Sequence, residues 1–251
     1  MALTDGIIGC WSPSVRGSGY LLPDLSGRGN HGTLTNMDAG TDWPGATVRG
    51  VSGRVLDFDG TNDYVTAGIN GLRSLTSVTL SVWANITSTS QAMFVNARST
   101  NTIFNFFVFG GSISLRGGSA TAVLVSAPSG TTNNWRHFLA TIRDTTGTIY
   151  YDGGSLASGT VTAIGASPTG LDIGAYSDFG GGYYLAGQLG EVAIYNRALT
   201  QPEVLELYRS GNGAIGRQLT GQTRRRVYGF VPAGFRAYWA RRQNQIIGGG
   251  V

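Results

Sequence analysis

Short runs in which apolar and polar residues alternate recur along most of the chain, with glycine-rich and asparagine-rich turns between them. In one run, Val78, Leu80 and Val82 alternate with small polar residues. Alternation with a period of two residues is typical of strands that bury one face. Similar strand-like runs occupy residues 54–64, 103–109, 122–125, 135–142, 148–151, 171–173 and 188–195. The pattern therefore predicts an all-β fold, a two-sheet antiparallel jelly-roll sandwich.

One segment has a helical pattern instead. Thr200 is a good N-cap residue, and Pro202 and Glu203 suit the first turn of a helix. Apolar residues follow at helical spacing, and Gly211 is a suitable stop. We expect one short helix near residues 200–210.

The amino-acid composition excludes several classes of protein. The chain has 251 residues, 41% of them hydrophobic, which is enough for a sizeable core. No apolar run approaches the length of a membrane span, so we expect no membrane partner. Cys10 is the single cysteine, which excludes an intrachain disulfide. The first residues lack a basic region followed by an apolar one, so we expect synthesis in the cytoplasm without export by the standard route.

The charge is distributed unevenly. All 18 basic residues are arginine. Residues 1–210 carry 11 arginines and 14 acidic residues, whereas residues 211–251 carry 7 arginines and no acidic residue. This asymmetry is typical of an interaction tail. We therefore divide the chain into a body, residues 1–211, and a basic aromatic arm, residues 212–251.

The arm combines arginines with five aromatic residues between positions 228 and 239, and it includes a short helical pattern after Pro232. Three interpretations are open: an anchor to a protein partner, packing on the body of the same chain, or nucleic-acid binding. The aromatic residues share one face, which favours protein docking and makes nucleic acid the weakest of the three. The expected anchoring residues are Arg224, Arg225, Arg226, Tyr228, Phe230, Phe235, Tyr238, Trp239, Arg241 and Arg242.

Five motifs in sequence order resemble those of laminin G-like, concanavalin A-like lectin and glucanase domains. They lie at residues 24–33 (DLSGRGNHGT), 56–65 (LDFDGTNDYV), 81–83 (SVW), 135–138 with 149–153 (WRHF and IYYDG), and 187–199 (GQLGEVAIYNRAL). The resemblance covers about residues 5–211 and implies a two-sheet jelly roll. The fold itself hosts lectins, enzymes, adhesins and virion proteins, so it does not name a function. The end of the arm also resembles the C-terminal tails of phage structural proteins.

The resemblance implies a structural calcium ion, since relatives often hold one near the first motif and the last strand. If the calcium site of these relatives is transferred to this sequence, the ligands would be Asp24, backbone oxygens near Arg28 and Asn30, and the side chain of Glu191. Gly190 stands where the family commonly has aspartate, which removes one ligand. The alternative interpretation is that Asp24 and Asn30 organise a turn.

The catalytic signatures of this fold are missing from the chain. The E-x-D-x-x-E pattern of related glucanases is absent. Asp57 and Asp59 share a strand face, but Asp59 opens a turn, where aspartate often caps the backbone. His137 is expected to be a core or edge histidine, and no nucleophile motif accompanies it. We therefore expect no enzymatic activity.

A sugar site is expected where aromatic rings and amide or carboxylate groups occur together. The stretch 176–184 has this composition, and the expected ligand-binding residues are Tyr176, Asp178, Phe179, Tyr183 and Tyr184. Residues 101–109 have the same character. The alternative is that these aromatic residues belong to the core.

The leading hypothesis is a non-enzymatic bacteriophage virion protein, acting in capsid decoration, a head fibre or the tail. Its arm would bind capsid or other virion proteins or sister subunits, which makes a homo-oligomer expected, and its body would contact glycans. Truncation after Gly211 is then expected to leave a folded body that no longer assembles. The alternative is a carbohydrate-binding module of a cell-surface or secreted protein. A third hypothesis, a glycosidase, would depend on Asp57 or Glu191.

Overall fold

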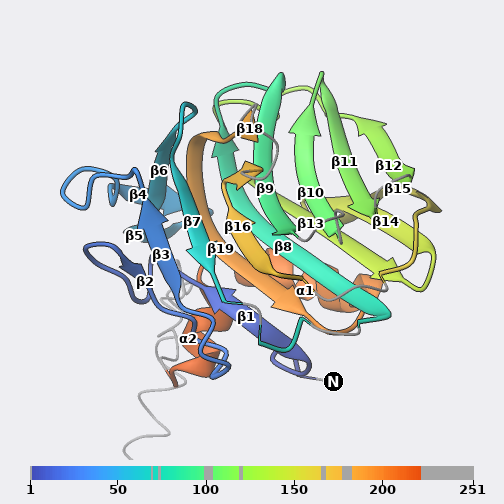
Figure 1. Cartoon of the computed structure of the whole chain (residues 1–251), viewed down its shortest axis with the longest axis horizontal. Helices are drawn as coiled ribbons and strands as arrows, with labels where there is room; N and C mark the ends of the chain where they lie inside the picture. The colour runs from blue at the N-terminus through green and yellow to red at the C-terminus, as the bar shows by residue number, and fades with distance from the viewer. Residues whose placement is uncertain are drawn as a thin grey trace, which may run out of the picture.

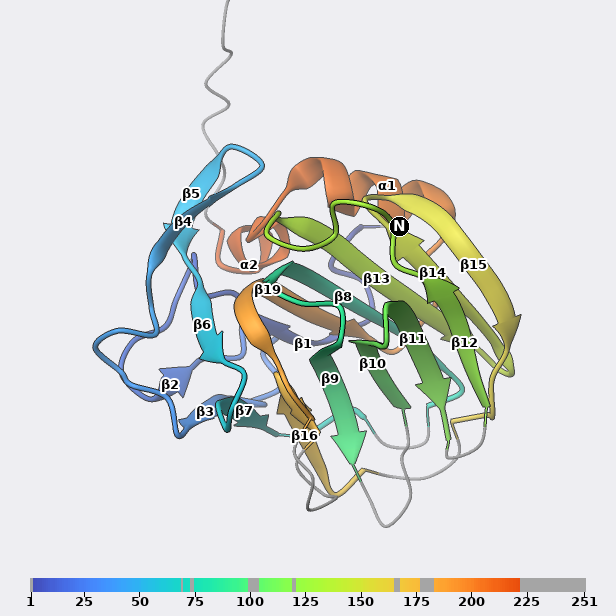
Figure 2. The same ribbon diagram turned by 90° about the horizontal axis from the view of Figure 1, so that it is seen from above.

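Two large antiparallel sheets, here called sheet A and sheet B, face each other across the core (Figures 1 and 2). The computed structural model describes residues 2–68, 70–72, 75–98, 104–118, 121–164, 168–176 and 183–221. Within these residues sheet A has seven strands and sheet B has eight. The sandwich predicted from the alternating pattern is confirmed.

Sheet A brings together strands from both ends of the body. Its spatial order is β1 (Ile7–Trp11), β19 (Ala186–Tyr195), β8 (Ser77–Ile86), β13 (Arg136–Arg143), β14 (Thr146–Tyr151) and β15 (Gly154–Thr160), with β6 (Leu56–Asp59) also paired to β19. The order in sheet B is β12 (Thr121–Ser126), β11 (Ser112–Gly117), β10 (Phe104–Phe109), β9 (Gln91–Arg98), β16 (Gly170–Ile173), β7 (Tyr64–Ala67), β3 (Gly32–Thr35) and β2 (Leu21–Leu22). Two further pairs are β4 (Gly45–Val48) with β5 (Val51–Arg54), and β17 (Ala175–Tyr176) with β18 (Tyr183–Tyr184).

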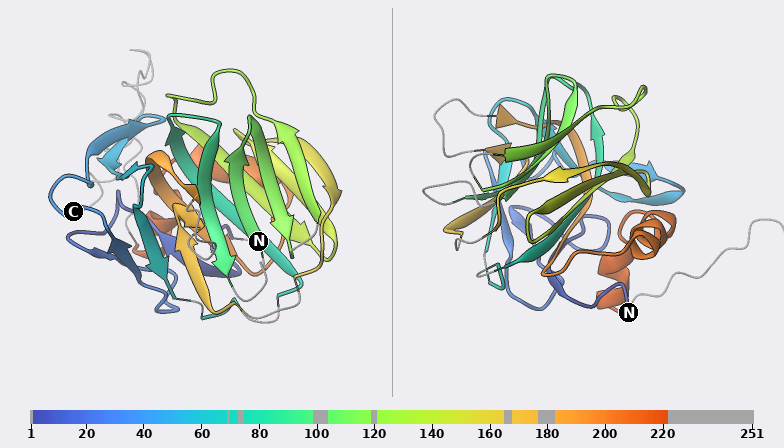
Figure 3. Two further views of the ribbon diagram at one scale, coloured as in Figure 1. Left: turned by 45° about the horizontal axis from the view of Figure 1, so that its top comes forward. Right: turned by 90° about the vertical axis from the view of Figure 1, so that its right-hand side faces the viewer.

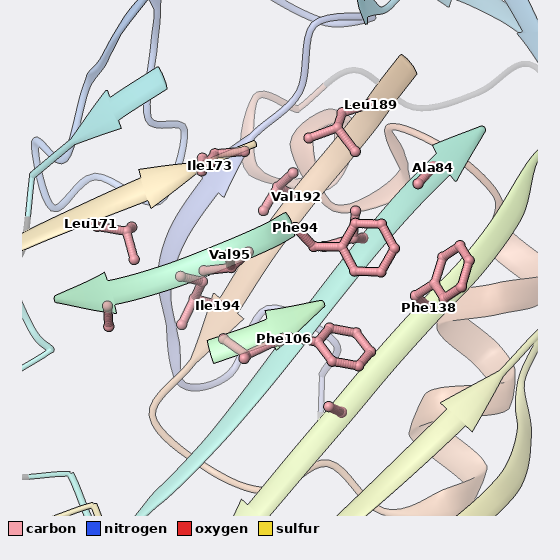
Figure 4. Packing of buried hydrophobic residues seen from close by; sticks show 14 of the residues in the cluster. Ala84, Phe94, Val95, Phe106, Phe138, Leu171, Ile173, Leu189, Val192 and Ile194 are labelled. Atoms are coloured by element: carbon pink, nitrogen blue, oxygen red, sulfur yellow. The ribbon is translucent and has the colours of Figure 1, made fainter. Parts of the chain in front are cut away.

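The core lies between the two sheets and is filled by alternate residues of their strands. The Phe94 ring of sheet B lies 4.6 Å from the Phe138 ring of sheet A and 5.5 Å from Phe106, centroid to centroid (Figure 4). All three rings are fully buried. Burying an aromatic side chain of this size stabilises a fold by about 1.5–3 kcal/mol, so this contact ties the sheets together.

A β-bulge in β9 sets which residues of sheet B face outward. Val95 pairs with Phe106 and Met93 pairs with Phe107, which leaves Phe94 as an extra residue in the ladder. Phe94 and Val95 both enter the core, and Met93 stays outside the core cluster. The bulge therefore keeps Met93 and Phe107 side by side on the outer face of sheet B.

Two helices lie outside sheet A, on the side away from sheet B (Figures 2 and 3). The predicted helix is confirmed as α1 (Gln201–Ser210). Its N-terminus has a capping box formed by Thr200 and Glu203. Glu203 also pairs with Arg197 at 2.8 Å, and burial of Leu207 attaches α1 to the sheet. No helix among the described residues is long and apolar enough to cross a membrane.

The second helix, α2 (Ala214–Leu219), was not expected from the sequence. Ile215 is fully buried in a cluster with residues of β1 and β19. The expected boundary at residue 211 therefore lies inside packed structure, because residues 212–219 contribute apolar contacts and hydrogen bonds to the body. The division into a body and an anchoring arm stays a prediction for residues 222–251, which lie outside the described residues.

Candidate functional site

The loop expected to hold calcium is closed by its own hydrogen bonds. Oδ1 of Asp24 accepts the N–H groups of Cys10 at 3.0 Å and Ser26 at 2.9 Å. Oδ2 accepts the N–H of Asn30 at 3.0 Å and the Ser26 hydroxyl at 2.7 Å. The Asp24 side chain is buried. It therefore stabilises a tight turn against β1 through four donors.

Asn30 connects the same loop to two other parts of the chain. Its side-chain amide donates to the carbonyls of Ile8 at 2.9 Å and Asn70 at 2.8 Å. Its Oδ1 accepts the N–H of Asn70 at 2.7 Å. The backbone oxygens expected as ligands also have partners, since Asn70 Nδ2 donates to Arg28 O at 3.1 Å and Trp11 Nε1 donates to Asn30 O at 2.8 Å.

Glu191, the remaining expected ligand, is buried beside Cys10 and holds the start of α2. Its Oε1 accepts the N–H of Ile215 at 3.1 Å, and its Oε2 accepts the N–H of Gly216 at 2.7 Å. The Cys10 thiol lies 3.9 Å from Oε2. Burial raises the pKa of Glu191, and the two backbone amides oppose that shift. Burial, with the nearby Glu191 and Asp24 carboxylates, raises the pKa of Cys10 well above its usual value.

These residues do not fit a calcium ion as they stand, because their carboxylate oxygens already accept N–H and O–H groups. Among the described residues, no group of three or more histidine, cysteine, aspartate or glutamate side chains could hold a metal ion. Calcium binding stays a prediction. A rise in melting temperature with millimolar calcium that a chelator reverses is the observation that would support it.

The groups considered for catalysis have structural roles. Oδ1 of Asp59 accepts the N–H groups of Thr61 at 2.7 Å and Asn62 at 3.3 Å, so it caps a turn. His137, expected as a core or edge residue, is fully buried, with Nε2 2.8 Å from the Ser81 hydroxyl. Burial, with the nearby Arg49, lowers the pKa of His137 to about 3. Its Nδ1 has no hydrogen-bond partner, so this pair lacks the orienting acid of a hydrolytic triad.

A different surface, the outer face of sheet B, carries a hollow of about 110 Å³. Alternation in β10 explains its location, because Phe104, Phe106 and Val108 enter the core and the residues between them face outward. The β17–β18 pair lies against β9 (Figure 1). Its residues Tyr176 and Tyr183 line the hollow. The described residues that line this outer hollow are Gln91, Ala92, Met93, Asn105, Phe107, Val108, Phe109, Arg116, Tyr176 and Tyr183.

Ring contacts organise the walls of the outer hollow. The Tyr183 ring meets Phe109 edge to face, with centroids 5.6 Å apart, and lies 6.2 Å from Tyr176. The guanidinium of Arg116 lies over the Phe107 ring, 5.3 Å from its centroid. Phe109 and Tyr183 are 48% and 39% exposed, high values for aromatic residues that contact each other. The hollow therefore presents aromatic surface to solvent.

A row of polar residues crosses sheet B beneath the same hollow. Cα pairing places Asp172 of β16 beside Asn96 of β9, then Asn105 of β10, then Arg116 of β11. Asp172 and Asn96 are fully buried, and Asn105 is 2% exposed. Neither side-chain polar atom of Asn96 has a hydrogen-bond partner, and Oδ1 of Asn105 has none either. Buried amides without partners are costly, and of these two residues Asn105 lines the hollow, which makes its Oδ1 a candidate contact for a polar ligand group.

The structure brings only some of the expected sugar-binding residues together. Tyr176 and Tyr183 line the outer hollow, whereas the Tyr184 ring lies 6.5 Å from Tyr64 of β7. Asp178 and Phe179 lie outside the described residues, as do all ten expected anchoring residues of the arm. Sequence reasoning named the stretch 101–109 as suited to sugars and so pointed toward Phe107 and Phe109, but it missed Arg116. The sequence signal for Arg116 was a charged residue at an outward position of a strand. That signal points to the site only once the structure shows that Arg116 pairs with Asn105.

Comparisons with known proteins identify a family and several solved structures that are similar to this chain. The sequence matches the family model of the "Concanavalin A-like lectin/glucanases superfamily" over residues 59–205. No curated protein matches the chain significantly.

Solved structures share the fold at low sequence identity. The binding domain of Paraclostridial Mosquitocidal Protein 1 matches with a TM-score of 0.62 and 17% identity, over 83% of this chain and 53% of that one. The binding domain of Botulinum Neurotoxin DC in complex with SialylT gives 0.62 and 12%, over 83% and 52%. A Trypanosoma rangeli sialidase mutant displaying trans-sialidase activity gives 0.60 and 17%, over 82% and 33%.

The chain thus spans about half the length of the two toxin domains and a third of the sialidase. At these identities the structural likeness establishes the fold alone. The family match covers more than half of the chain. The protein therefore belongs to the concanavalin A-like lectin/glucanases superfamily.

Proposed function

We propose that this protein is a non-catalytic carbohydrate-binding domain and that the sugar binds in the outer hollow of sheet B. Membership of a lectin-containing superfamily supports this function, as does the likeness to toxin binding domains, one of them in complex with SialylT. The likeness also favours binding over catalysis, although the superfamily name includes glucanases.

The observation that carries the proposal is the convergence of four aromatic side chains on one hollow above unpartnered amides. Phe107, Phe109, Tyr176 and Tyr183 offer ring faces and edges against which the apolar face of a pyranose can pack. Asn105 lines the same hollow, and its Oδ1 can accept a sugar hydroxyl. Pockets that bind small ligands combine apolar walls with a few such polar groups.

The experiment is a screen of the full-length protein on an array of neutral and acidic glycans, followed by calorimetric titration with the strongest binder. Tyr183→Ala is expected to weaken binding about tenfold or more, since stacking and burial at an aromatic contact contribute about 1–3 kcal/mol. Tyr20→Ala is the matched control, because Tyr20 is 61% exposed and lies outside the hollow lining. Absence of any glycan ligand, or equal losses in both variants, would contradict the proposal.

Display on a virus particle is a second candidate, favoured by one observation: residues 211–251 carry 7 arginines and no acidic residue. In this proposal the arm binds capsid or other virion proteins, the protein is part of the virion, and the lectin-type body faces outward. Peptide mass spectrometry of density-purified virus particles tests it. A stoichiometric copy number relative to the major capsid protein would support it, and absence from particles would contradict it.

A further inference from the structure

Arg116 is the only charged side chain among the described residues that line the outer hollow. It lies on β11 with an exposed side chain, directly across from Asn105 of β10. The next outward residue of the same strand, Ser114, is neutral and buried. The described wall of the hollow therefore carries a single positive charge surrounded by aromatic and amide groups.

The contact with Phe107 places this charge over an aromatic ring of the wall, 5.3 Å from the ring centroid. A guanidinium over an aromatic ring uses its flat face for the cation–π contact, and its N–H donors point outward in the plane of the group. Within the described part of the chain, no carboxylate forms an ion pair with Arg116. Its donors are thus available for an anionic group of a ligand.

A carboxylate suits these donors, because its two oxygens match the spacing of two guanidinium N–H groups. Such a group would still lie close to the rest of the site, since Asn105 pairs with Arg116 in the ladder and Asn96 pairs with Asn105. Sugar hydroxyls next to the carboxylate could then reach the unpartnered Oδ1 of Asn105.

We propose that the outer hollow selects sugars that carry a carboxylate, with Arg116 binding the carboxylate and the aromatic wall packing on the sugar ring. This inference rests on the proposed carbohydrate binding and adds the substrate class, an acidic sugar such as a sialic or uronic acid. Arg116 is then the residue that determines specificity, and the aromatic residues supply affinity for neutral and acidic sugars alike.

The test compares matched sugars by calorimetry on the full-length protein. The probes are 3′-sialyllactose against lactose, and a glucuronate-terminated disaccharide against its glucose-terminated counterpart. We expect at least one acidic probe to bind about tenfold or more tighter than its neutral partner, as a charge-assisted contact would give. Arg116→Gln is expected to remove that preference, so that the acidic and the neutral partner of each pair bind with the same affinity within about twofold.

The control is Arg143→Gln, which makes the same change of charge at an exposed arginine of sheet A, away from the outer hollow. It is expected to retain the preference for the acidic sugar. Equal affinity for acidic and neutral sugars, or a preference that survives in Arg116→Gln, overturns the inference and leaves carbohydrate binding standing. Failure of both probe pairs and of every sugar on the array overturns the proposed function, and the inference with it.

Discussion

Glu191 of β19 accepts the backbone N–H of Gly216 at 2.7 Å, across 25 residues of sequence. The same carboxylate accepts the N–H of Ile215 at 3.1 Å. Both N–H groups belong to the first turn of α2, where a helix has no internal acceptors. One buried side chain of sheet A therefore fixes the position of a helix that the apolar pattern alone does not predict.

Removing this carboxylate is expected to destabilise the protein strongly. Glu191→Ala leaves two buried N–H groups without acceptors, each at a cost of about 1–3 kcal/mol, so we expect a loss of roughly 2–5 kcal/mol in the free energy of unfolding. Denaturant unfolding measures the loss, and faster hydrogen exchange at Ile215 and Gly216 locates it. Glu206→Ala, on the exposed face of α1, is the control and should change stability by less than about 0.5 kcal/mol. A small effect of Glu191→Ala would show that α2 does not depend on this contact.

Two truncations test where the packed body ends. A chain that stops after Gly221 keeps α2, whereas one that stops after Gly211 loses the buried Ile215 and leaves Glu191 without its amide donors. We expect the longer chain to be more stable by about 3 kcal/mol or more. Thermal and denaturant unfolding of the two chains measures this difference in stability. Equal stability would mean that the packed body ends at residue 211, as first expected. The chain that stops after Gly221 is also the better variant for testing an anchoring role of residues 222–251.

The aromatic contact between the sheets is expected to be a main source of stability. Phe94→Ala removes a fully buried ring and should cost about 3–5 kcal/mol. Phe109→Ala changes a ring that is 48% exposed at the outer hollow, so we expect a loss of about 1 kcal/mol or less. Chemical denaturation of both variants provides the comparison. Similar losses would mean that Phe109 is more deeply packed than its exposure indicates, and that binding data from hollow variants need correction for unfolding.

The ion pair between Arg197 and Glu203 predicts a pH dependence. Its hydrogen bonds lower the pKa of Glu203 to about 2, below the value of about 4.5 expected in the unfolded chain. The stabilisation is therefore fully present above pH 4.5 and is lost as the pH falls from 4.5 toward 2. Glu203→Gln should reduce the free energy of unfolding by about 1 kcal/mol at pH 7, and the difference from wild type should vanish near pH 2. Glu206→Gln is the matched control, and a difference independent of pH would contradict the assignment.

Local pattern was sufficient for part of the secondary structure of the body, but strands such as β9 (Gln91–Arg98) and β11 (Ser112–Gly117) were not predicted. Period-2 alternation placed β8, β13 and β19, and the sequence Thr200-Gln201-Pro202-Glu203 placed α1, because the signals lie within a few consecutive residues. The same reasoning predicted a core or edge position for His137, and the structure buries it fully. It missed α2, which is short and depends on the distant Glu191 for the start of its first turn.

The sequence by itself thus determined an all-β sandwich of the laminin G-like type, with a helix after the last strand and aromatic stretches suited to sugars. The tertiary structure alone decided which of those aromatic residues meet. Asn96, Asn105 and Arg116 become neighbours only through the register of β9, β10 and β11, and the bulge at Phe94 sets which residues share their face. Register depends on pairing between strands that are separate in sequence, and a shift by one residue would turn each side chain to the opposite face.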